Sequence, residues 1–123
     1  MAKIILLTGI LALLPLFGYA ANSSRQFGGV GIDGVPLTDG RIVVRQLVVG
    51  GPAHLAGIRI GDILIRIDGK ETRGSNFADI IEHRLRGRAG TKVLLIVHRP
   101  GEARQLRFNL TRRQLLVGAG AKR

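Results

Sequence analysis

The sequence predicts an α+β domain, a partly open β-barrel or sandwich of five or six strands with one short and one longer helix. Three observations carry this prediction. Short runs of β-branched residues recur along the chain, turn-forming residues separate them, and residues 75–86 repeat their apolar side chains at helical spacing. The 123 residues suit a single domain of this kind.

The first 20 residues have the order of a secretory signal peptide. A short basic start is followed by the apolar run 4–17, and small residues precede a polar stretch. We expect cleavage after Ala20, a linker over residues 21–26, and a periplasmic or secreted product. The apolar run is short for a membrane span and contains Pro15, so an uncleaved inner-membrane anchor is the alternative.

The first half of the domain is expected to hold three strands and a short helix. Residues 30–33 form a short strand, and residues 41–49 are rich in β-branched side chains. Pro52 suits a first helical position and Gly57 the left-handed residue after a helix, which predicts one or two helical turns between them. An alternating strand then ends at the tight turn Asp68-Gly69.

The longer helix is predicted over residues 75–86. Ser75 is its expected N-cap, Asp79 lies favourably near its start, and Gly87 ends it. Its apolar stripe consists of Phe77, Ile80, Ile81 and Leu85.

Two strands complete the predicted domain. The nearly continuous apolar run from Thr91 is typical of a central strand, and the alternation of residues 103–110 is typical of a strand with one buried face. The domain is therefore expected to span residues 27–111. Residues 112–123 are expected to form a basic, disordered tail.

Composition and charge restrict the class of protein. The chain contains no cysteine, so an exported domain must rely on its apolar core instead of disulfides. A net charge of +11 favours acidic partners. The export signal and the few aromatic residues available for base stacking argue against nucleic acid. A solvated basic surface is the simplest interpretation, and binding to an acidic membrane surface is a secondary hypothesis.

Gly29, Gly31 and Gly34 have the spacing of a dinucleotide-binding loop. That fold needs a buried strand before the first glycine and a helix after it, whereas here a polar linker precedes and a turn at Pro36 follows. The dinucleotide interpretation fails on this context. The backbone N–H groups can still accept an anion, such as the carboxylate of a peptide that adds itself as a further strand along residues 30–33. The alternative is a glycine-rich turn without a ligand.

Three stretches of the chain resemble bacterial PDZ domains. The stretch GVGI, residues 29–32, is similar to their carboxylate-binding loop. Residues 50–72 resemble the most recognisable stretch of the PDZ domains in HtrA-type serine proteases and carboxyl-terminal processing proteases. Residues 75–101 resemble the groove helix and the strand after it. The resemblance covers about residues 27–110 and implies a PDZ-like fold that the final strand closes.

The resemblance also implies a peptide groove between the strand after the loop and the longer helix. The N–H groups of Val30, Gly31 and Ile32 would face the carboxylate, with Gly29 opening the loop. Arg25 is a candidate contact through water, and a solvated linker charge is its alternative role. The side chains implied to line the groove are Val30, Ile32, Ala78, Ile81 and Leu85.

The implied ligands are protein or peptide C-termini with an apolar last residue. Many animal PDZ domains begin the groove helix with a histidine that reads a serine or threonine of the peptide, but this chain has Asn76-Phe77-Ala78 there. An edge strand is also open to a second copy, so self-association through it is a further expectation.

No catalytic set is visible in the sequence. None of the serines (Ser23, Ser24 and Ser75) lies in a nucleophile motif, and the three histidines lack metal-ligand spacing, so neither a metal nor a cofactor is expected. The first functional hypothesis is an exported peptide-binding adaptor or regulator of a protease or secretion machine, which a start at Met1 with its own signal favours. The alternative is an accessory domain or remnant of a protease whose catalytic part lies on another chain. A weaker alternative is a basic binder of membrane surfaces or polyanions.

Overall fold

The computed structural model describes residues 27–115, so the predicted signal segment, the linker with Arg25 and most of the tail lie outside the described residues. The elements follow the predicted α+β order. They are β1 (Phe27–Gly28), β2 (Ile32–Pro36), β3 (Ile42–Leu47), α2 (Pro52–Ala56), β4 (Ile63–Ile67), β5 (Lys70–Glu71), α3 (Phe77–Ile80), the π-helical segment η1 (Ile81–Leu85), β6 (Gly87–Arg88), β7 (Lys92–His98) and β8 (Leu106–Thr111).

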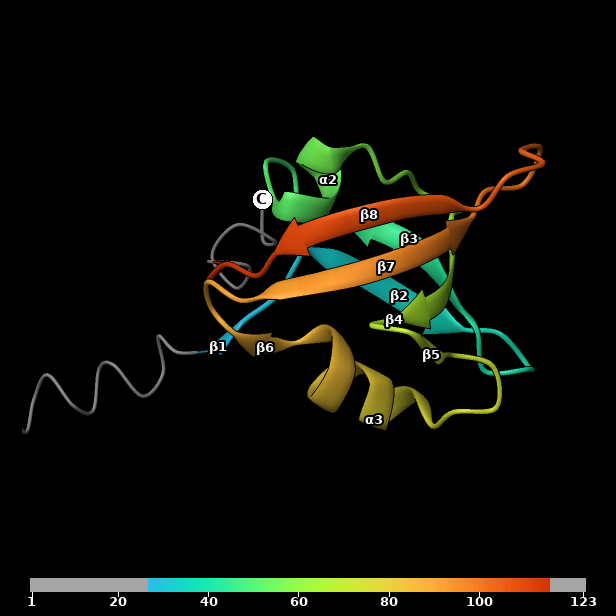
Figure 1. Cartoon of the computed structure of the whole chain (residues 1–123), viewed down its shortest axis with the longest axis horizontal. Helices are drawn as coiled ribbons and strands as arrows, with labels where there is room; N and C mark the ends of the chain where they lie inside the picture. Colours follow the sequence, from blue (N-terminus) through green and yellow to red (C-terminus); the bar gives the residue numbers. More distant parts are fainter. Residues whose placement is uncertain (1–26, 116–123) are drawn as a thin grey trace, which may run out of the picture.

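A six-stranded antiparallel sheet forms the centre of the molecule. Its strands follow the order β2-β3-β4-β7-β8, with β5 paired to β4, while β1 and β6 form a separate two-stranded ribbon. The strands curve around a common interior, α2 lies on one side of them, and α3 with η1 lies on the other (Figure 1). Strands β2 and β8 are the two ends of the sheet, and only these can offer an unpaired long edge.

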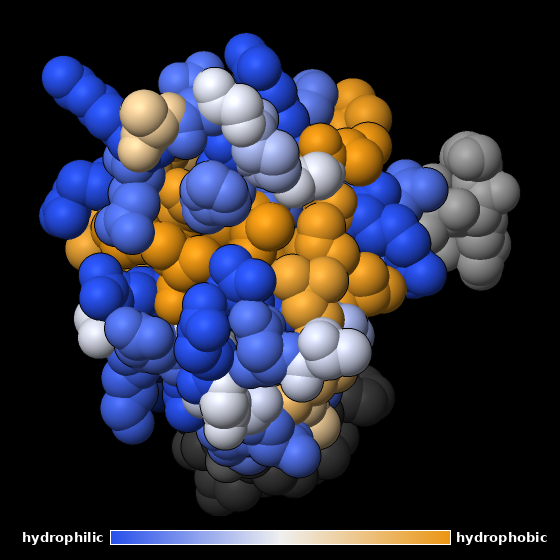
Figure 2. Space-filling view, turned by 90° about the vertical axis from the view of Figure 1, so that its right-hand side faces the viewer, coloured by the Kyte–Doolittle hydropathy of each residue, from blue (hydrophilic) through white to orange (hydrophobic). Residues whose placement is uncertain are grey.

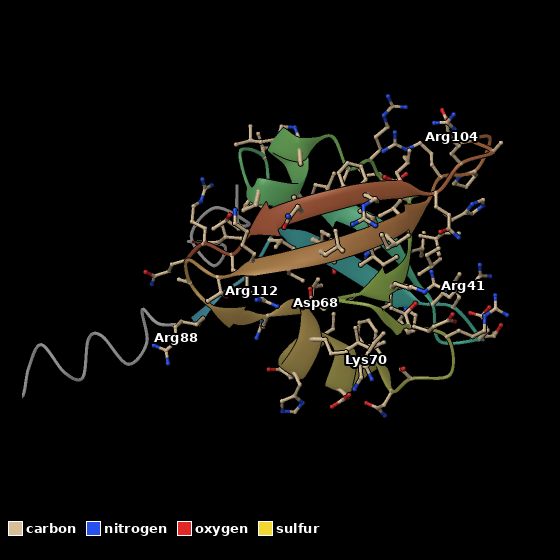
Figure 3. All side chains as sticks on the ribbon, viewed as in Figure 1. Arg41, Asp68, Lys70, Arg88, Arg104 and Arg112 are labelled. Carbon is tan, nitrogen blue, oxygen red and sulfur yellow. The ribbon has the colours of Figure 1, made fainter. Side chains whose placement is uncertain are left out.

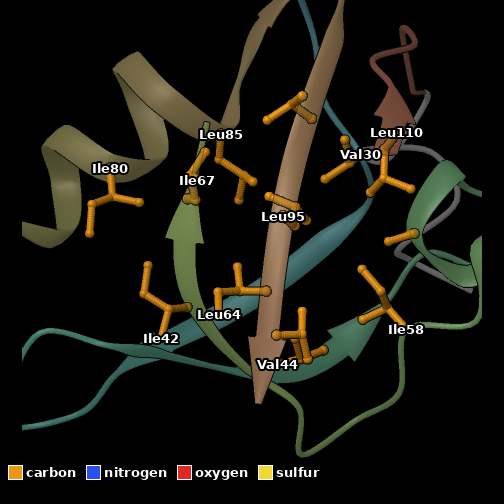
Figure 4. Close-up of a cluster of buried hydrophobic side chains, with 13 residues drawn as sticks. Val30, Ile42, Val44, Ile58, Leu64, Ile67, Ile80, Leu85, Leu95 and Leu110 are labelled. Atoms are coloured by element: carbon orange, nitrogen blue, oxygen red, sulfur yellow. The ribbon is translucent and has the colours of Figure 1, made fainter. Parts of the chain in front are cut away.

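The core fills the space between the sheet and the helices (Figure 4). The almost entirely apolar β7 lies between β4 and β8, as predicted for a central strand, and Leu95 and Val97 are fully buried. The alternation along β8 places Leu106, Phe108 and Leu110 against the core, which confirms the predicted face. No tryptophan is available, so aliphatic side chains dominate this interior.

The short helix and the tight turn follow their predicted chemistry. Pro52 begins α2, and Gly57 ends it in the left-handed region at φ 101°. The turn that joins β4 to β5 has positive φ at both central residues, 50° at Asp68 and 84° at Gly69. The Asp68 carboxylate also accepts a hydrogen bond from the Leu94 N–H at 2.8 Å, which ties this turn to β7.

The caps of the longer helix differ from the prediction. The N-cap is Asn76, whose side-chain oxygen accepts the Asp79 N–H at 3.0 Å. The Ser75 hydroxyl instead donates to the Glu71 carbonyl at 3.1 Å, because the chain turns into the helix one residue later than expected. At the other end the backbone becomes extended at Arg86, so Gly87 is not the stop but the first residue of β6.

Gly87 is required by an arginine that lies beyond the predicted end of the domain. A Cβ at Gly87 would lie 2.8 Å from Cζ of Arg112, a side chain that is only 9% exposed. The Arg112 guanidinium donates to the carbonyls of Arg84 at 2.8 Å and Leu85 at 3.0 Å, the last carbonyls of η1. It also donates to the Thr91 hydroxyl and the Lys92 carbonyl. Arg112 thus holds the end of the helix against the strands (Figure 3).

A buried ion pair joins the segment after α2 to the end of β7. The Asp62 carboxylate is 1% exposed and accepts two hydrogen bonds from the Arg99 guanidinium, both at 2.8 Å. It also accepts the Arg59 N–H at 2.9 Å. Burial acts to raise the pKa of Asp62, but the hydrogen bonds from Arg99 and Arg59 outweigh it and hold the pKa below its usual value. This ion pair therefore joins two segments that are 37 residues apart in the sequence.

Candidate functional site

Strand β2 offers an unpaired edge beside the glycine loop. In the described part of the chain β2 pairs with β3 alone. The Val48 N–H donates to the Gly31 carbonyl at 2.9 Å, and the Leu37 N–H donates to the Arg41 carbonyl at 2.7 Å. These bonds direct the Gly31 carbonyl and the Leu37 N–H toward β3.

The main-chain groups that face the free edge follow from alternation along the strand. The pairing shifts between Asp33, opposite Gln46, and Gly34, opposite Val44, so the extra residue of the bulge lies on β3. Alternation on β2 itself is therefore unbroken from residue 31 to residue 37. Ile32 and Gly34 consequently direct their N–H and C=O groups away from β3, and at the next such position Pro36 has no N–H to donate.

The glycine loop is held by its carbonyl oxygens. The Val30 carbonyl accepts the Ala53 N–H from the first turn of α2 at 2.9 Å, and the Gly31 carbonyl accepts the Val48 N–H. Gly29 exchanges two main-chain hydrogen bonds with Arg113, at 3.0 and 2.9 Å. Within residues 27–115 the N–H groups of Val30 and Gly31 donate to no backbone acceptor. The loop therefore presents two adjacent N–H groups without a backbone partner among the described residues.

Each glycine of the motif has a different role. Gly31 adopts φ 82°, a conformation that side-chain-bearing residues rarely take. A Cβ at Gly34 would lie 2.5 Å from Cγ2 of Ile42, a fully buried side chain, so Gly34 permits close packing of β2 on the core. A Cβ at Gly29 would meet nothing within 4 Å. Close packing and a left-handed turn thus account for two of the three glycines.

This difference gives a matched pair of variants. We expect Gly34→Ala to lower the free energy of unfolding by about 1–3 kcal/mol, because the added methyl overpacks Ile42. Gly29→Ala, in the same motif, is expected to change it by less than about 0.5 kcal/mol. Urea unfolding of both variants measures the effect, and equal stability of the two would contradict the close contact.

The predicted groove side chains divide into two groups. Ile32 and Ile81 are partly buried and pack against the core, and Ala78 is exposed. Val30 and Leu85 are only 2% and 4% exposed, because their side chains belong to the core (Figure 4). Their burial places them among the core residues, whereas Ile32, Ile81 and Ala78 remain at least partly accessible.

Two hollows on the described surface lie away from β2. One, of about 650 Å³, lies between Pro52 and Leu55 of α2 and residues 109–114 at the end of β8. A smaller one, of about 320 Å³, is lined by arginines and by Ile65 and His98 on the sheet. A peptide that extends a sheet needs an exposed row of main-chain groups and not an enclosed cavity. The free edge of β2 therefore fits such a ligand better than either hollow.

Apolar surface is also accessible on this molecule. Figure 2 shows a hydrophobic band across one side, between hydrophilic residues above and below it. Several apolar side chains are only partly buried against the core, and these are Ile32, Leu47, Phe77, Ile81, Leu106 and Phe108.

Arg113 is a candidate site residue that lies within the predicted tail, residues 112–123. Its main chain pairs with Gly29, and its guanidinium donates to the Gly50 carbonyl at 2.7 Å, which places a cation beside the loop. A basic residue after the last strand has no local pattern that distinguishes it from its neighbours. Arg25, the predicted cation, lies outside the described residues.

Two further features were sought in residues 27–115, a metal-binding cluster and a membrane-spanning helix. That part of the chain contains no group of His, Asp and Glu side chains arranged to hold a metal ion. Nor does any of its helices have the length and apolar character needed to cross a membrane. His83 is exposed and contacts the Asp79 carboxylate one helical turn away, at 3.0 Å.

A curved antiparallel sheet whose end strand follows a glycine loop is the PDZ arrangement, and comparisons with known proteins agree. Residues 43–99 match the model of the PDZ domain family. The carboxy-terminal processing protease CtpA of Bacillus subtilis is 37% identical over 78 residues, which cover 63% of this chain and 16% of that protein. The carboxy-terminal-processing protease of Bartonella bacilliformis is 33% identical over 98 residues, which cover 80% of this chain and 22% of that protein.

Two solved structures share the fold. The photosystem II D1 C-terminal processing protease has a TM-score of 0.67 and 30% identity, over 73% of this chain and 24% of its own. The PDZ domain of a carboxy-terminal protease from Vibrio cholerae was solved in complex with a peptide. It has a TM-score of 0.62 and 27% identity, over 72% of this chain and 95% of its own. Residues 43–99 thus match a PDZ domain, and the fold is that of the PDZ domains in these relatives. The chain spans about a fifth of the length of the curated relatives it matches.

Proposed function

We propose that this PDZ domain binds an extended peptide by adding it as a strand to the free edge of β2. The observation that carries the proposal is the orientation of the main chain: Ile32 and Gly34 direct their N–H and C=O groups to the free edge, next to the loop. These groups supply the ladder of hydrogen bonds that an added strand needs. The solved Vibrio cholerae relative in complex with a peptide supports this use of the fold.

The proposed anchor is the C-terminal carboxylate of the peptide, bound by the N–H groups of Val30, Gly31 and Ile32. Hydrogen bonds to a charged group contribute about 1.5–3 kcal/mol each, so two or three are enough to select a free carboxylate. Because the peptide loses conformational freedom on binding, we expect an affinity on the order of micromolar or weaker. Arg113, and Arg25 through water, would add a favourable positive charge.

The proposed pocket for the last side chain of the peptide is apolar. Ile32 and Ile81 form its walls over the buried side chains of Val30 and Leu85, and the exposed Ala78 lies at its mouth. A basic or acidic last residue would lose its hydration there without gaining a partner. Partners are therefore proteins or peptides with an apolar C-terminus.

In the cell we infer an exported adaptor or regulator of a protease or a secretion machine. The apolar run 4–17 supports export, and the relatives are processing proteases. Secretion and purification of the chain should yield a mature protein that begins at Ala21, which intact mass measures; a product that retains the run would support the anchored alternative. An accessory role for a catalytic part on another chain is the second candidate, favoured because the relatives contain the matched region within a longer protease.

The affinity experiment compares one apolar-ended peptide in two forms. We expect the free acid to bind at least about tenfold more tightly than its C-terminal amide, because the amide loses the charge-assisted hydrogen bonds. Fluorescence anisotropy of the labelled peptides measures both affinities. The protein is kept dilute so that the β2 edges of two copies do not pair. Ile81→Ser should weaken binding of the free acid, while Glu82→Gln on the same helical segment should not. Equal affinity for acid and amide would remove the carboxylate from the proposal.

A further inference from the structure

The three most exposed large hydrophobic side chains of residues 27–115 come from one short segment. Val49 is 83% exposed, Leu55 is 69% exposed and Ile60 is 65% exposed. Val49 precedes α2, Leu55 lies on it and Ile60 follows it, so all three project from residues 49–60, which we call the α2 apex. Because all three occur within twelve consecutive residues, this segment is a candidate interaction surface.

The α2 apex is a rigid part of the fold, so its exposed side chains are presented by a fixed backbone. The Gly51 N–H donates to the Val48 carbonyl at 2.9 Å, and the Gly50 N–H donates to Nδ1 of His54 at 3.0 Å. After the helix, the Gly57 carbonyl accepts the Arg99 guanidinium at 2.9 Å. Hydrogen bonds therefore hold the backbone of the apex before and after α2.

The charges around the apex favour an anionic partner. Residues 40–61 contain no aspartate or glutamate, whereas Arg59 lies between Leu55 and Ile60 and is exposed. The guanidinium of Arg113 reaches the apex at the Gly50 carbonyl. The nearest following acid, Asp62, is buried and neutralised by Arg99. The chain as a whole has a net charge of +11.

We propose that the α2 apex docks on an anionic membrane surface, with its three apolar side chains in the headgroup region and its arginines beside lipid phosphates. Separate apolar side chains with cations among them are the pattern of shallow membrane insertion, and each nearby arginine strengthens attraction to anionic lipid. Because α2 and α3 lie on opposite sides of the sheet (Figure 1), docking through the apex leaves the α3 side facing water.

The absence of cysteine allows a direct test on the full chain. Leu55→Cys and Glu82→Cys, the latter an exposed position of η1 and used as the control, are each labelled with an environment-sensitive fluorophore. The chains are bound to phosphatidylcholine vesicles with and without phosphatidylglycerol. Both chains contain the same N-terminal apolar run, so attachment through that run affects them equally. We expect the probe at residue 55 to enter lipid only when phosphatidylglycerol is present, and the probe at residue 82 to stay in water.

Two further variants separate the apolar and charged contributions. In the Leu55→Cys chain, Val49→Ser with Ile60→Ser should lower the ratio of lipid-inserted to water-exposed probe roughly tenfold. Arg59→Gln should lower it roughly fivefold, and Lys70→Gln, on the α3 side in Figure 3, should leave it unchanged. The proposal is overturned if the probe at residue 55 stays in water, enters both vesicles equally, or is matched by the probe at residue 82. The proposal would also be overturned if the probe at residue 55 stayed out of lipid but became shielded from water when a protein partner bound.

Discussion

Replacing Arg112 with methionine is expected to lower the free energy of unfolding by about 3–5 kcal/mol, the largest effect of any single substitution considered. The substitution removes a guanidinium that donates to the carbonyls of Arg84, Leu85 and Lys92 and to the Thr91 hydroxyl. Methionine has a similar length but no donor, so buried carbonyls lose their partners. Urea unfolding followed by circular dichroism measures the change.

The matched control for this prediction is Arg112→Lys. Lysine keeps the positive charge but cannot reproduce the planar fork of donors, so we expect it to recover only part of the lost stability. Hydrogen exchange should also show faster opening of η1 in Arg112→Met, because the guanidinium is the partner of the last helical carbonyls. Wild-type stability of Arg112→Met would show that the bonds contribute nothing net and would contradict the role assigned to this residue.

Asp62→Asn is expected to cost about 3 kcal/mol at neutral pH, because it leaves the largely buried guanidinium of Arg99 without its carboxylate. The same pair makes stability depend on pH. The pKa of Asp62 is lowered in the folded protein, so its stabilising contribution is complete above the usual aspartate value, about 3.9, and is lost as the pH falls through the lower folded-state value. The pKa of Arg99 is raised by the Asp62 hydrogen bond, far above this range.

The measurement is the free energy of unfolding at neutral pH and at several acidic values below about pH 4. The wild type should lose stability in that acidic range by more than Asp62→Asn does. Asp33→Asn is the control: its pair with Arg45 is about half exposed on both sides, and exposed pairs contribute little. Parallel acid profiles of the wild type and Asp62→Asn would contradict the link between β7 and the segment after α2.

Most of the fold could be predicted because individual residues mark where the helices and strands begin and end. The Pro52 start, the Gly57 stop and the Asp68-Gly69 turn are set by backbone conformations that few residues adopt, and all three occur where expected. Periodicity likewise identified the central β7 and the buried face of β8. The longer helix was predicted with the wrong N-cap because Ser75 and Asn76 are both good caps, and the choice depends on a contact to Glu71.

The parts that sequence reasoning missed depend on distant partners. Arg112 and Asp62 are buried charges whose roles come from residues 27 and 37 positions away, and nothing in their local sequence indicates this. The short β1–β6 ribbon has the same origin, since two-residue strands have no periodicity. A short strand was predicted over residues 30–33, but β2 covers Ile32–Pro36, because its pairing with β3 continues through Pro36. The burial of Val30 and Leu85 likewise depends on how the core packs.

The most direct test of the central claim is a backbone amide NMR titration of the protein with an apolar-ended peptide. Peptide addition along β2 predicts that the amide signals of Val30, Gly31, Ile32 and Gly34 move most, and that amidation of the peptide C-terminus suppresses the shifts of the first three. Shifts concentrated instead around Leu55 and residues 109–114, where the larger hollow lies, would contradict strand addition at β2 and place the ligand between α2 and β8.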